Sequence, residues 1–157
     1  MQNRNTAIPA AYVFLEQEGK FLITRRRNTG YQDGNYQVPA GHIDEDELPS
    51  EAAIRETKEE VGVDIRPEDL EFVHVSYRPK HDDTDDRVDF FFRAKKWFGE
   101  VKIMEPEKCD DLRWVAPEEM PTNVSLHVRD AMRCVQEGIF FNELGFGFLK
   151  KHGLYQL

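Results

Sequence analysis

The sequence contains no apolar stretch long enough to cross a membrane. Its longest uncharged apolar run covers residues 7–15, about half of the ~20 residues that a spanning helix needs. The run is also a poor secretory signal, because Glu16, Gln17 and Glu18 follow where a small-residue cleavage site would stand. We therefore expect no membrane association and interpret the run as the first strand of a folded domain.

Cysteine is also scarce. The chain has two cysteines, Cys109 and Cys134, which are too few for a disulfide framework and do not have the spacing of metal ligands. A reducing compartment is the default for such a chain, so we expect the protein to be cytoplasmic.

Positive charge is in deficit. The chain has 21 Lys and Arg residues against 30 Asp and Glu residues, which gives a formal net charge of −9. Proteins that bind nucleic-acid backbones use Lys and Arg to neutralise the phosphates, so we expect no nucleic-acid partner. A small phosphorylated substrate is compatible with this charge if a divalent cation supplies the missing positive charge.

Linkers, internal repeats and low-complexity tracts are absent as well. A chain of 157 residues fits one domain of typical size and buries roughly 68–70% of its unfolded surface. We therefore expect a single domain over residues 1–157.

Turn residues and hydrophobic periodicity divide the chain into strands and two helices. Start and end signals predict helices over residues 49–62 and 125–137, followed by a cap at Gly138. Runs rich in β-branched and aromatic residues predict strands at residues 8–16, 20–26, 70–77, 87–97 and 112–115, with short strand pieces within 36–43. The tail at 139–157 is left unassigned. Strands before, between and after two helices predict a mixed α/β domain.

Three carboxylates gather on one face of the first predicted helix. At 100° per residue, Glu56, Glu59 and Glu60 share an arc of about 100°, while Lys58 points to the opposite side. Glu56 and Glu60 form a like-charge pair that costs roughly 0.2–0.5 kcal/mol on an exposed helix. Converging carboxylates suit a hard divalent cation such as Mg²⁺.

An acidic helix face in contact with water is the other interpretation of these residues, because charge runs on helices usually face solvent. Helix chemistry alone leaves both interpretations open. A Pro39-Ala40-Gly41 turn before the helix favours the metal site, since a glycine turn lets the backbone approach a ligand closely. A metal at this site could polarise phosphates and activate a water molecule.

Residues 41–63 resemble the signature of the Nudix hydrolase family, G-x5-E-x7-R-E-U-x-E-E-x-G-U, in which U is a bulky aliphatic residue. The fixed positions are occupied by Gly41, Glu47, Arg55, Glu56, Glu59, Glu60 and Gly62. Thr57, at the first U position, departs from the pattern at a packing position that binds no ligand. Upstream, residues 21–26 and 38–41 resemble the MutT-type subgroup of the family.

The resemblance implies a fold, a reaction and a cofactor. The fold would be an α/β/α sandwich with a mixed central β-sheet. The reaction would be hydrolysis of a nucleoside triphosphate to a nucleoside monophosphate and pyrophosphate, dependent on Mg²⁺ with Mn²⁺ as a substitute. An oxidised purine triphosphate of the 8-oxo-dGTP type is one specialisation within this class.

The resemblance also assigns residues to metal binding and catalysis. The metal ligands would be the Ala40 carbonyl, Glu56, Glu59, Glu60 and a late-loop glutamate, for which Glu107 is the first choice and Glu105 the alternative. Glu56 would also activate the attacking water, and Arg55 would orient Glu56 through a charge-assisted hydrogen bond. Glu47 would be an auxiliary acid near the metal.

Arg26, Asn123 and His42 are the candidates for substrate binding. Arg26 stands where the subgroup has a phosphate-contacting arginine; alternatively it is a strand-end residue facing water, and Arg25 and Arg27 compete for the role. Asn123 precedes the second helix, where the subgroup reads the base, and its amide offers both donor and acceptor. Its other interpretation is a cap or turn residue. His42 adjoins Gly41.

Other functions stay open at this stage. Hydrolysis of ADP-ribose or of a dinucleoside polyphosphate would use the same glutamates. A non-catalytic nucleotide-binding regulator would be expected to lack them, and all three are present. The aromatic tail at 139–157 favours a homodimer as a further hypothesis, and the acidic loop at 81–86 is interpreted as a solvated hairpin tip.

Overall fold

The computed structural model describes residues 3–80, 85–145 and 151 of the chain. Within them, eight strands form one sheet in the order β3-β2-β1-β6-β5-β8, with β4 paired to β1 and β7 paired to β2. The strands are β1 (Ala7–Gln17), β2 (Lys20–Arg26), β3 (Tyr36–Gln37), β4 (Ala40–His42), β5 (Leu70–Arg78), β6 (Asp86–Ala94), β7 (Cys109–Val115) and β8 (Phe141–Glu143).

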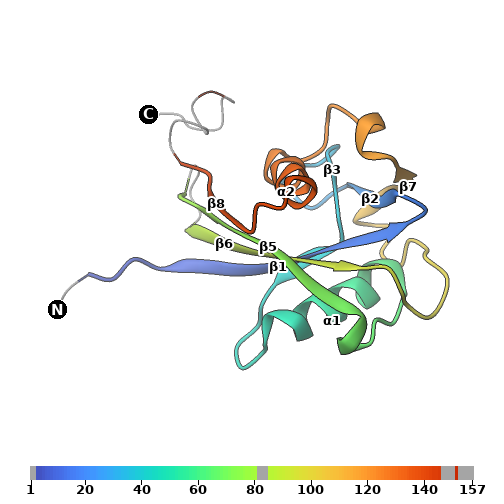
Figure 1. Cartoon of the computed structure of the whole chain (residues 1–157), viewed down its shortest axis with the longest axis horizontal. Coiled ribbons are helices and arrows are strands. Elements are labelled where there is room, and N and C mark those ends of the chain that lie inside the picture. Colours follow the sequence, from blue (N-terminus) through green and yellow to red (C-terminus); the bar gives the residue numbers. More distant parts are fainter. Residues whose placement is uncertain (1–2, 81–84, 146–150, 152–157) are drawn as a thin grey trace.

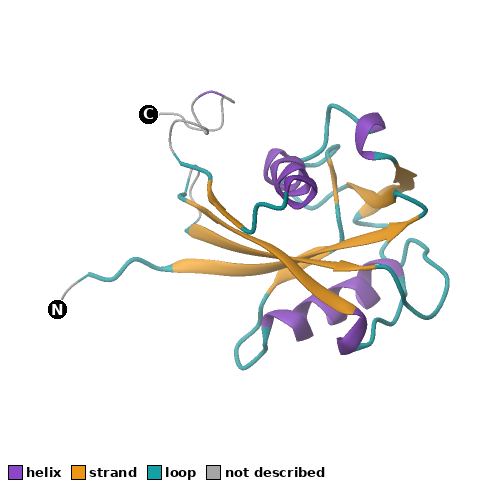
Figure 2. Ribbon diagram, viewed as in Figure 1, coloured by secondary structure: helices purple, strands orange, loops and turns teal. Residues whose placement is uncertain are grey.

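The two α-helices lie on opposite faces of the sheet. In Figure 1, α2 (Leu126–Glu137) is above the sheet and α1 (Pro49–Val61) is below it, and Figure 2 shows the same three layers by element type. Short 3₁₀ turns occupy η1 (Pro67–Asp69) and η2 (Pro117–Glu119). The expected α/β/α sandwich with a mixed sheet is therefore confirmed.

Strand β1 is the centre of this architecture. It pairs in parallel with β6 from Ala7 to Leu15 and antiparallel with β4 and the start of β2. Successive side chains of a strand point to opposite faces, so Phe14 enters the core layer beneath α2 and Val13 enters the layer beneath α1. Both faces of β1 are therefore buried, which explains its nearly continuous apolar sequence.

Helix α1 begins and ends where the sequence signals predict. Pro49 occupies the first turn, Glu51 accepts a hydrogen bond from the backbone N–H of Leu48 at 2.9 Å, and Gly62 caps the end with φ 79°. Ala52, Ala53, Thr57 and Val61 are its buried residues. The Thr57 hydroxyl donates to the Ala53 carbonyl at 2.7 Å, so a polar side chain is satisfied at a position where the family pattern has an aliphatic one.

Helix α2 also matches its prediction, and Gly138 caps it with φ 71°. Strand β6 ends at Ala94 rather than at residue 97, because the Phe98 backbone pairs with Asp64 instead. Strand β7 begins at Cys109 rather than at residue 112, because a bulge between Arg25 and Arg26 extends its pairing with β2.

The region left unassigned after Gly138 contributes a strand. Strand β8 pairs in parallel with β5, from Val75 opposite Phe141 to Tyr77 opposite Glu143. Two predictions concern residues that lie largely outside the described ones. The hairpin-tip interpretation of the acidic loop concerns residues 81–84, and the homodimer contact of the tail concerns residues 146–150 and 152–157.

A buried ion pair joins the two strands of the β5–β6 hairpin. Arg78 Nε donates to Asp89 Oδ2 at 2.6 Å, and both side chains are at most 5% exposed. Removing one partner of such a pair leaves an uncompensated buried charge, which is strongly destabilising.

No helix among the described residues is long and apolar enough to cross a membrane.

Candidate active site

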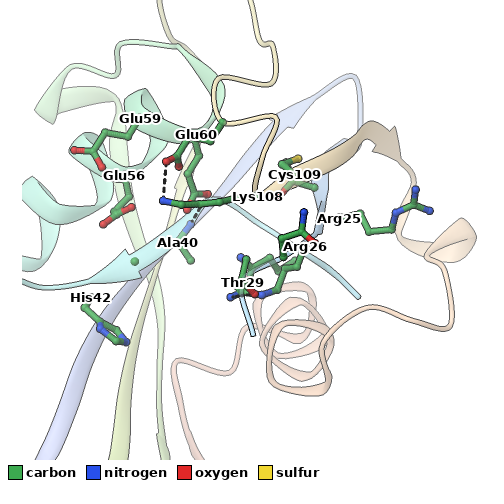
Figure 3. A pocket seen from close by; sticks show the side chains of 15 residues that line it. Arg25, Arg26, Thr29, Ala40, His42, Glu56, Glu59, Glu60, Lys108 and Cys109 are labelled. Atoms are coloured by element: carbon green, nitrogen blue, oxygen red, sulfur yellow. Dashed lines mark hydrogen bonds and ion pairs between the residues drawn. The ribbon is translucent and has the colours of Figure 1, made fainter. Parts of the chain in front are cut away.

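One cleft gathers most of the residues that the sequence singled out. It has a volume of about 560 Å³ and is lined by strand β2, the start of β4, the second half of α1 and the turn at 105–109 (Figure 3). Glu56, Glu59 and Glu60 enter it from α1, and Ala40 and Gly41 form its edge on β4. The spacing prediction that three glutamates share one helix face is therefore confirmed as geometry.

Strand β4 contacts the glutamates directly. The Ala40 backbone N–H donates to Glu60 Oε2 at 3.3 Å. A Cβ atom at Gly41 would lie 2.0 Å from the carboxyl carbon of Glu56 and 2.1 Å from its Oε1. The backbone of Gly41 is not in the left-handed region, so what the position requires is space. The missing side chain lets the Glu56 carboxylate lie against the strand.

Two carboxyl groups of the cleft have raised pKa values. Burial, reinforced by the negative charge of Glu56, raises the pKa of Glu60 to about 8, although the hydrogen bond from Ala40 opposes this. Burial also raises the pKa of Glu56, against the lowering effect of the adjacent Arg55 guanidinium. Glu105 adds to the negative potential at both groups. A cation entering the cleft would relieve this repulsion.

Arg55 links the glutamates of α1 to the loop before it. Its Nη1 donates to Glu56 Oε1 at 2.6 Å, and its Nε and Nη2 donate to the two oxygens of Glu47 at 2.7 and 2.8 Å. The Arg55 hydrogen bonds lower the pKa of Glu47 to about 2. Glu47 is not one of the residues lining the cleft and contacts it through Arg55.

The late-loop glutamate that reaches the cleft is Glu105. Glu107, the first choice from the sequence, is exposed and is not among the lining residues. A turn is the reason: the backbone N–H groups of Lys108 and Cys109 both donate to the Glu105 carbonyl, at 2.9 and 3.0 Å. The turn brings Glu105 into the cleft wall and leaves Glu107 facing solvent.

The three arginines at the end of β2 have different positions. Arg26 lines the cleft, where its Nε donates to the Tyr31 carbonyl at 2.7 Å and its Nη2 to the Thr29 hydroxyl at 3.0 Å. Arg25 also borders the cleft, but its guanidinium points away from the glutamates (Figure 3) and pairs with Asp110 at 2.6 Å. Arg27 is not a lining residue.

Asn123 and His42 do not converge with the glutamates. The Asn123 side-chain amide donates to the Gly34 carbonyl at 2.8 Å, and Asn123 is not a lining residue. Asn123 lies in a turn before α2, and its side chain joins this turn to the 27–35 loop. His42 lines the cleft edge, with its ring directed away from the carboxylates in Figure 3. Its carbonyl accepts a hydrogen bond from Arg55 at 3.2 Å.

Lys108 is a cleft residue that sequence reasoning did not identify. Its Nζ donates to Glu105 Oε2 at 2.9 Å. In Figure 3 the Lys108 side chain reaches towards the labelled glutamates of α1. A lysine beside two glutamates in a loop carries no periodic or motif signal, so its position depends on the turn at 105–108.

The donor chemistry of the cleft fits a hard divalent cation. Carboxylate and carbonyl oxygens are the ligands that Mg²⁺ prefers, and the cleft offers them from Ala40, Glu56, Glu59, Glu60 and Glu105. Within the described part of the chain, no three His, Cys, Asp or Glu side chains are already arranged around a common metal position. Glu56 is bonded to Arg55 through one oxygen, and the Glu59 side chain is 55% exposed.

Known proteins share both the sequence pattern and the architecture. Residues 6–133 match the family model described as the NUDIX domain. The phosphatase NudJ of Escherichia coli K12 is 32% identical over 129 residues, which cover 79% of this chain and 80% of NudJ. NudJ of Shigella flexneri matches to the same extent.

Solved structures give the same result for the fold. A MutT NUDIX hydrolase from Burkholderia pseudomallei superimposes with a TM-score of 0.76 and 21% identity, over 82% of this chain and 98% of that one. A MutT protein from Methanosarcina mazei Go1 gives a TM-score of 0.73 and 20% identity, over 87% and 97% of the two chains.

Proposed function

This chain belongs to the Nudix hydrolase family and is a hydrolase of pyrophosphate bonds, and we propose that it is a Mg²⁺-dependent pyrophosphohydrolase of nucleoside triphosphates. The products are a nucleoside monophosphate and pyrophosphate. The observation that carries the proposal is the convergence of Glu56, Glu60 and Glu105 on one cleft, where burial and mutual repulsion raise the pKa of Glu60. A polyanionic substrate enters such a cleft only together with cations.

The metal-binding groups in this proposal are the Ala40 carbonyl, Glu56, Glu59, Glu60 and Glu105. Glu105 replaces Glu107 because of its position in the cleft wall. A bound Mg²⁺ supplies charge neutralisation of the phosphate chain and lowers the pKa of water.

Glu56 is the proposed proton acceptor for the attacking water. Burial raises the pKa of Glu56, which makes its carboxylate a stronger base than an exposed glutamate. Arg55 acts as a positioning residue, because its 2.6 Å hydrogen bond fixes one oxygen of Glu56 and leaves the other free for water. Glu47 in turn holds Arg55. Arg26, at the opposite wall, is the proposed phosphate contact.

A phosphatase reaction is the second candidate, because the curated relatives with 32% identity are named phosphatases. It uses the same cleft and the same glutamates, but water attacks the terminal phosphorus, the bond from that phosphorus to the bridging oxygen breaks, and the products are inorganic phosphate and a nucleotide with one phosphate fewer. One experiment therefore decides both the substrate class and the bond that is cleaved. The substrates to be compared include ADP-ribose and dinucleoside polyphosphates.

The experiment is a substrate panel with the full chain and Mg²⁺ at alkaline pH. The panel contains canonical and oxidised nucleoside triphosphates, nucleoside diphosphates, ADP-ribose and dinucleoside polyphosphates, and nucleotides, pyrophosphate and phosphate are separated by chromatography. The proposal requires monophosphate and pyrophosphate from a triphosphate, lost with chelator and in Glu56→Gln. Inorganic phosphate as the first product selects the phosphatase reaction, and turnover of ADP-ribose alone overturns the substrate class. No turnover with intact metal binding supports the non-catalytic regulator.

Two further proposals concern location and assembly. Cys109 and Cys134 are both free thiols, which supports a cytoplasmic location. Phe140 and Phe141 are 56% and 55% exposed beside β5, which supports a homodimer through this surface. Gel filtration of Phe141→Ser tests the dimer, because this change leaves the backbone pairing of β8 possible. A wild-type monomer contradicts it.

A further inference from the structure

Lys108 extends a positive charge across the cleft towards the glutamates. Its Nζ is 2.9 Å from Glu105 Oε2, and its side chain is 59% exposed although it borders the cleft. In Figure 3 the side chain runs from the β7 side towards Glu56, Glu59 and Glu60. The chain therefore provides one cation of its own near the carboxylates that are expected to bind metal.

The other cations that line the cleft are held elsewhere. Arg25 is paired with Asp110 on the outer side of β2. Arg26 makes two hydrogen bonds to the 29–31 segment and lies over the ring of Tyr31, 5.6 Å from its centroid. Arg25 also lies over the ring of Tyr36, 5.8 Å from its centroid, so moving either guanidinium breaks more than one interaction. Among the described residues, Lys108 has one ion pair to exchange.

The main chain of Lys108 is fixed while its ammonium group is not. The Lys108 N–H donates to the Glu105 carbonyl at 2.9 Å, and its carbonyl accepts from the Arg27 N–H at 2.8 Å. An exposed lysine–glutamate pair contributes little to stability. The anchored backbone and the flexible side chain allow the ammonium group to change partner within the cleft at little cost.

We propose that Lys108 is a tethered counter-ion that pairs with Glu105 in the metal-free protein and moves to the outermost phosphate of the substrate when a metal ion takes Glu105. This inference rests on the proposed function, and it names the substrate class: a phosphate chain with a free end. An ammonium group has three donors and no acceptor, which suits a terminal phosphate with its additional negative charge. A phosphate chain capped by a sugar or by a second nucleoside offers no such end.

Metal binding without substrate tests the first half. Lys108→Met removes the competing charge, and Lys95→Met is the matched control, since Lys95 is 60% exposed and pairs with Glu16 at 3.7 Å outside the cleft. Titration with Mn²⁺, followed by electron paramagnetic resonance, is expected to give about two- to fivefold tighter binding in Lys108→Met. The control binds as the wild type does. Unchanged or weaker Mn²⁺ binding in Lys108→Met overturns the competition.

Binding of tripolyphosphate tests the second half without turnover. Calorimetry with tripolyphosphate and Ca²⁺ is expected to show about tenfold weaker binding in Lys108→Met, restored in large part by Lys108→Arg and unaffected by Lys95→Met. Affinity for ADP-ribose under the same conditions changes less than about twofold, because a capped diphosphate has no terminal group to lose. If Lys108→Met loses the same affinity for tripolyphosphate and ADP-ribose, or loses affinity for neither, the assignment of Lys108 to the outermost phosphate is overturned.

The two proposals fail in different ways. Absence of turnover on the whole substrate panel defeats the proposed function, while Mn²⁺ and tripolyphosphate affinities still decide the role of Lys108. Full turnover of a triphosphate with equal tripolyphosphate affinity in wild type and Lys108→Met defeats this inference alone.

Discussion

Arg55 and Glu47 are joined by two parallel hydrogen bonds, Nε to Oε1 at 2.7 Å and Nη2 to Oε2 at 2.8 Å. The planar guanidinium matches a carboxylate in this geometry. Because the remaining nitrogen, Nη1, donates to Glu56, the pair transmits the position of the 44–48 loop to the proposed base. Four carboxylates in total lie within 3.5 Å of this one guanidinium: Asp44, Glu47, Glu56 and Glu59.

Replacing Arg55 by lysine tests this arrangement. A lysine keeps the charge but has no fork to hold Glu47 and Glu56 together, so we expect kcat to fall about 10- to 100-fold with a smaller change in KM. Arg133→Lys is the control, because Arg133 pairs with Asp130 and Glu137 on the exposed side of α2. Equal activity of the two variants would contradict the positioning role.

Replacing Glu60 by glutamine separates catalysis from stability. We expect turnover to fall by on the order of 100-fold or more, because a metal ligand is lost. The melting temperature of the metal-free protein should not fall, since glutamine is uncharged like the protonated form of Glu60 that burial favours. Glu137→Gln on α2 should change neither quantity. Near-full activity of Glu60→Gln would refute the metal-binding role.

The pH dependence of metal stabilisation follows from the same residue. Between the ordinary carboxyl pKa of 4.5 and the raised pKa of about 8, the unfolded chain has lost a proton that the folded chain keeps, so the free energy of unfolding falls as pH rises. Mg²⁺ binds the deprotonated form. The increase in melting temperature caused by Mg²⁺ should therefore be larger at about pH 8.5 than at about pH 6.5. In Glu60→Gln the increase caused by Mg²⁺ should be nearly the same at both pH values. An equal increase at both pH values in the wild type would contradict the prediction.

Replacing Gly41 by alanine should move Glu56 without unfolding the protein. The added Cβ would lie 2.0 Å from the Glu56 carboxyl carbon, and the far end of a flexible side chain yields more easily than backbone does. We expect at least about tenfold lower kcat with a nearly unchanged melting temperature. Gly145→Ala, where an added Cβ meets nothing within 4 Å, is the matched control. Retained kcat in Gly41→Ala would show that the position of Glu56 against the strand is unimportant.

The elements that the sequence predicts well are those with local signals. Helix α1 has a proline start, a glycine end and a buried stripe, and its glutamates point into one cleft as their angular spacing requires. The β1–β2 hairpin is likewise predicted from residues that are close in sequence, namely two apolar runs joined by a short turn. The proposed metal-binding glutamates of α1 belong to this group.

The features that it predicts poorly depend on distant segments. The choice between Glu105 and Glu107 depends on a turn whose orientation is set by pairing of β7 with β2. Strand β8 lacks alternation of its own and forms because β5 offers a free edge. The buried Arg78–Asp89 pair has no sequence signal either, since each residue alone resembles an exposed charge.

The parallel pairing of β1 with β6 has a kinetic consequence. The segment between these strands contains β2, β3, β4, α1 and β5, so a very long loop must close before this pairing forms. Contacts of such sequence separation slow folding, and α1 finds its buried surface only on the completed strands. During refolding, Mn²⁺ binding should therefore appear at the rate of the slowest structural phase and never ahead of it.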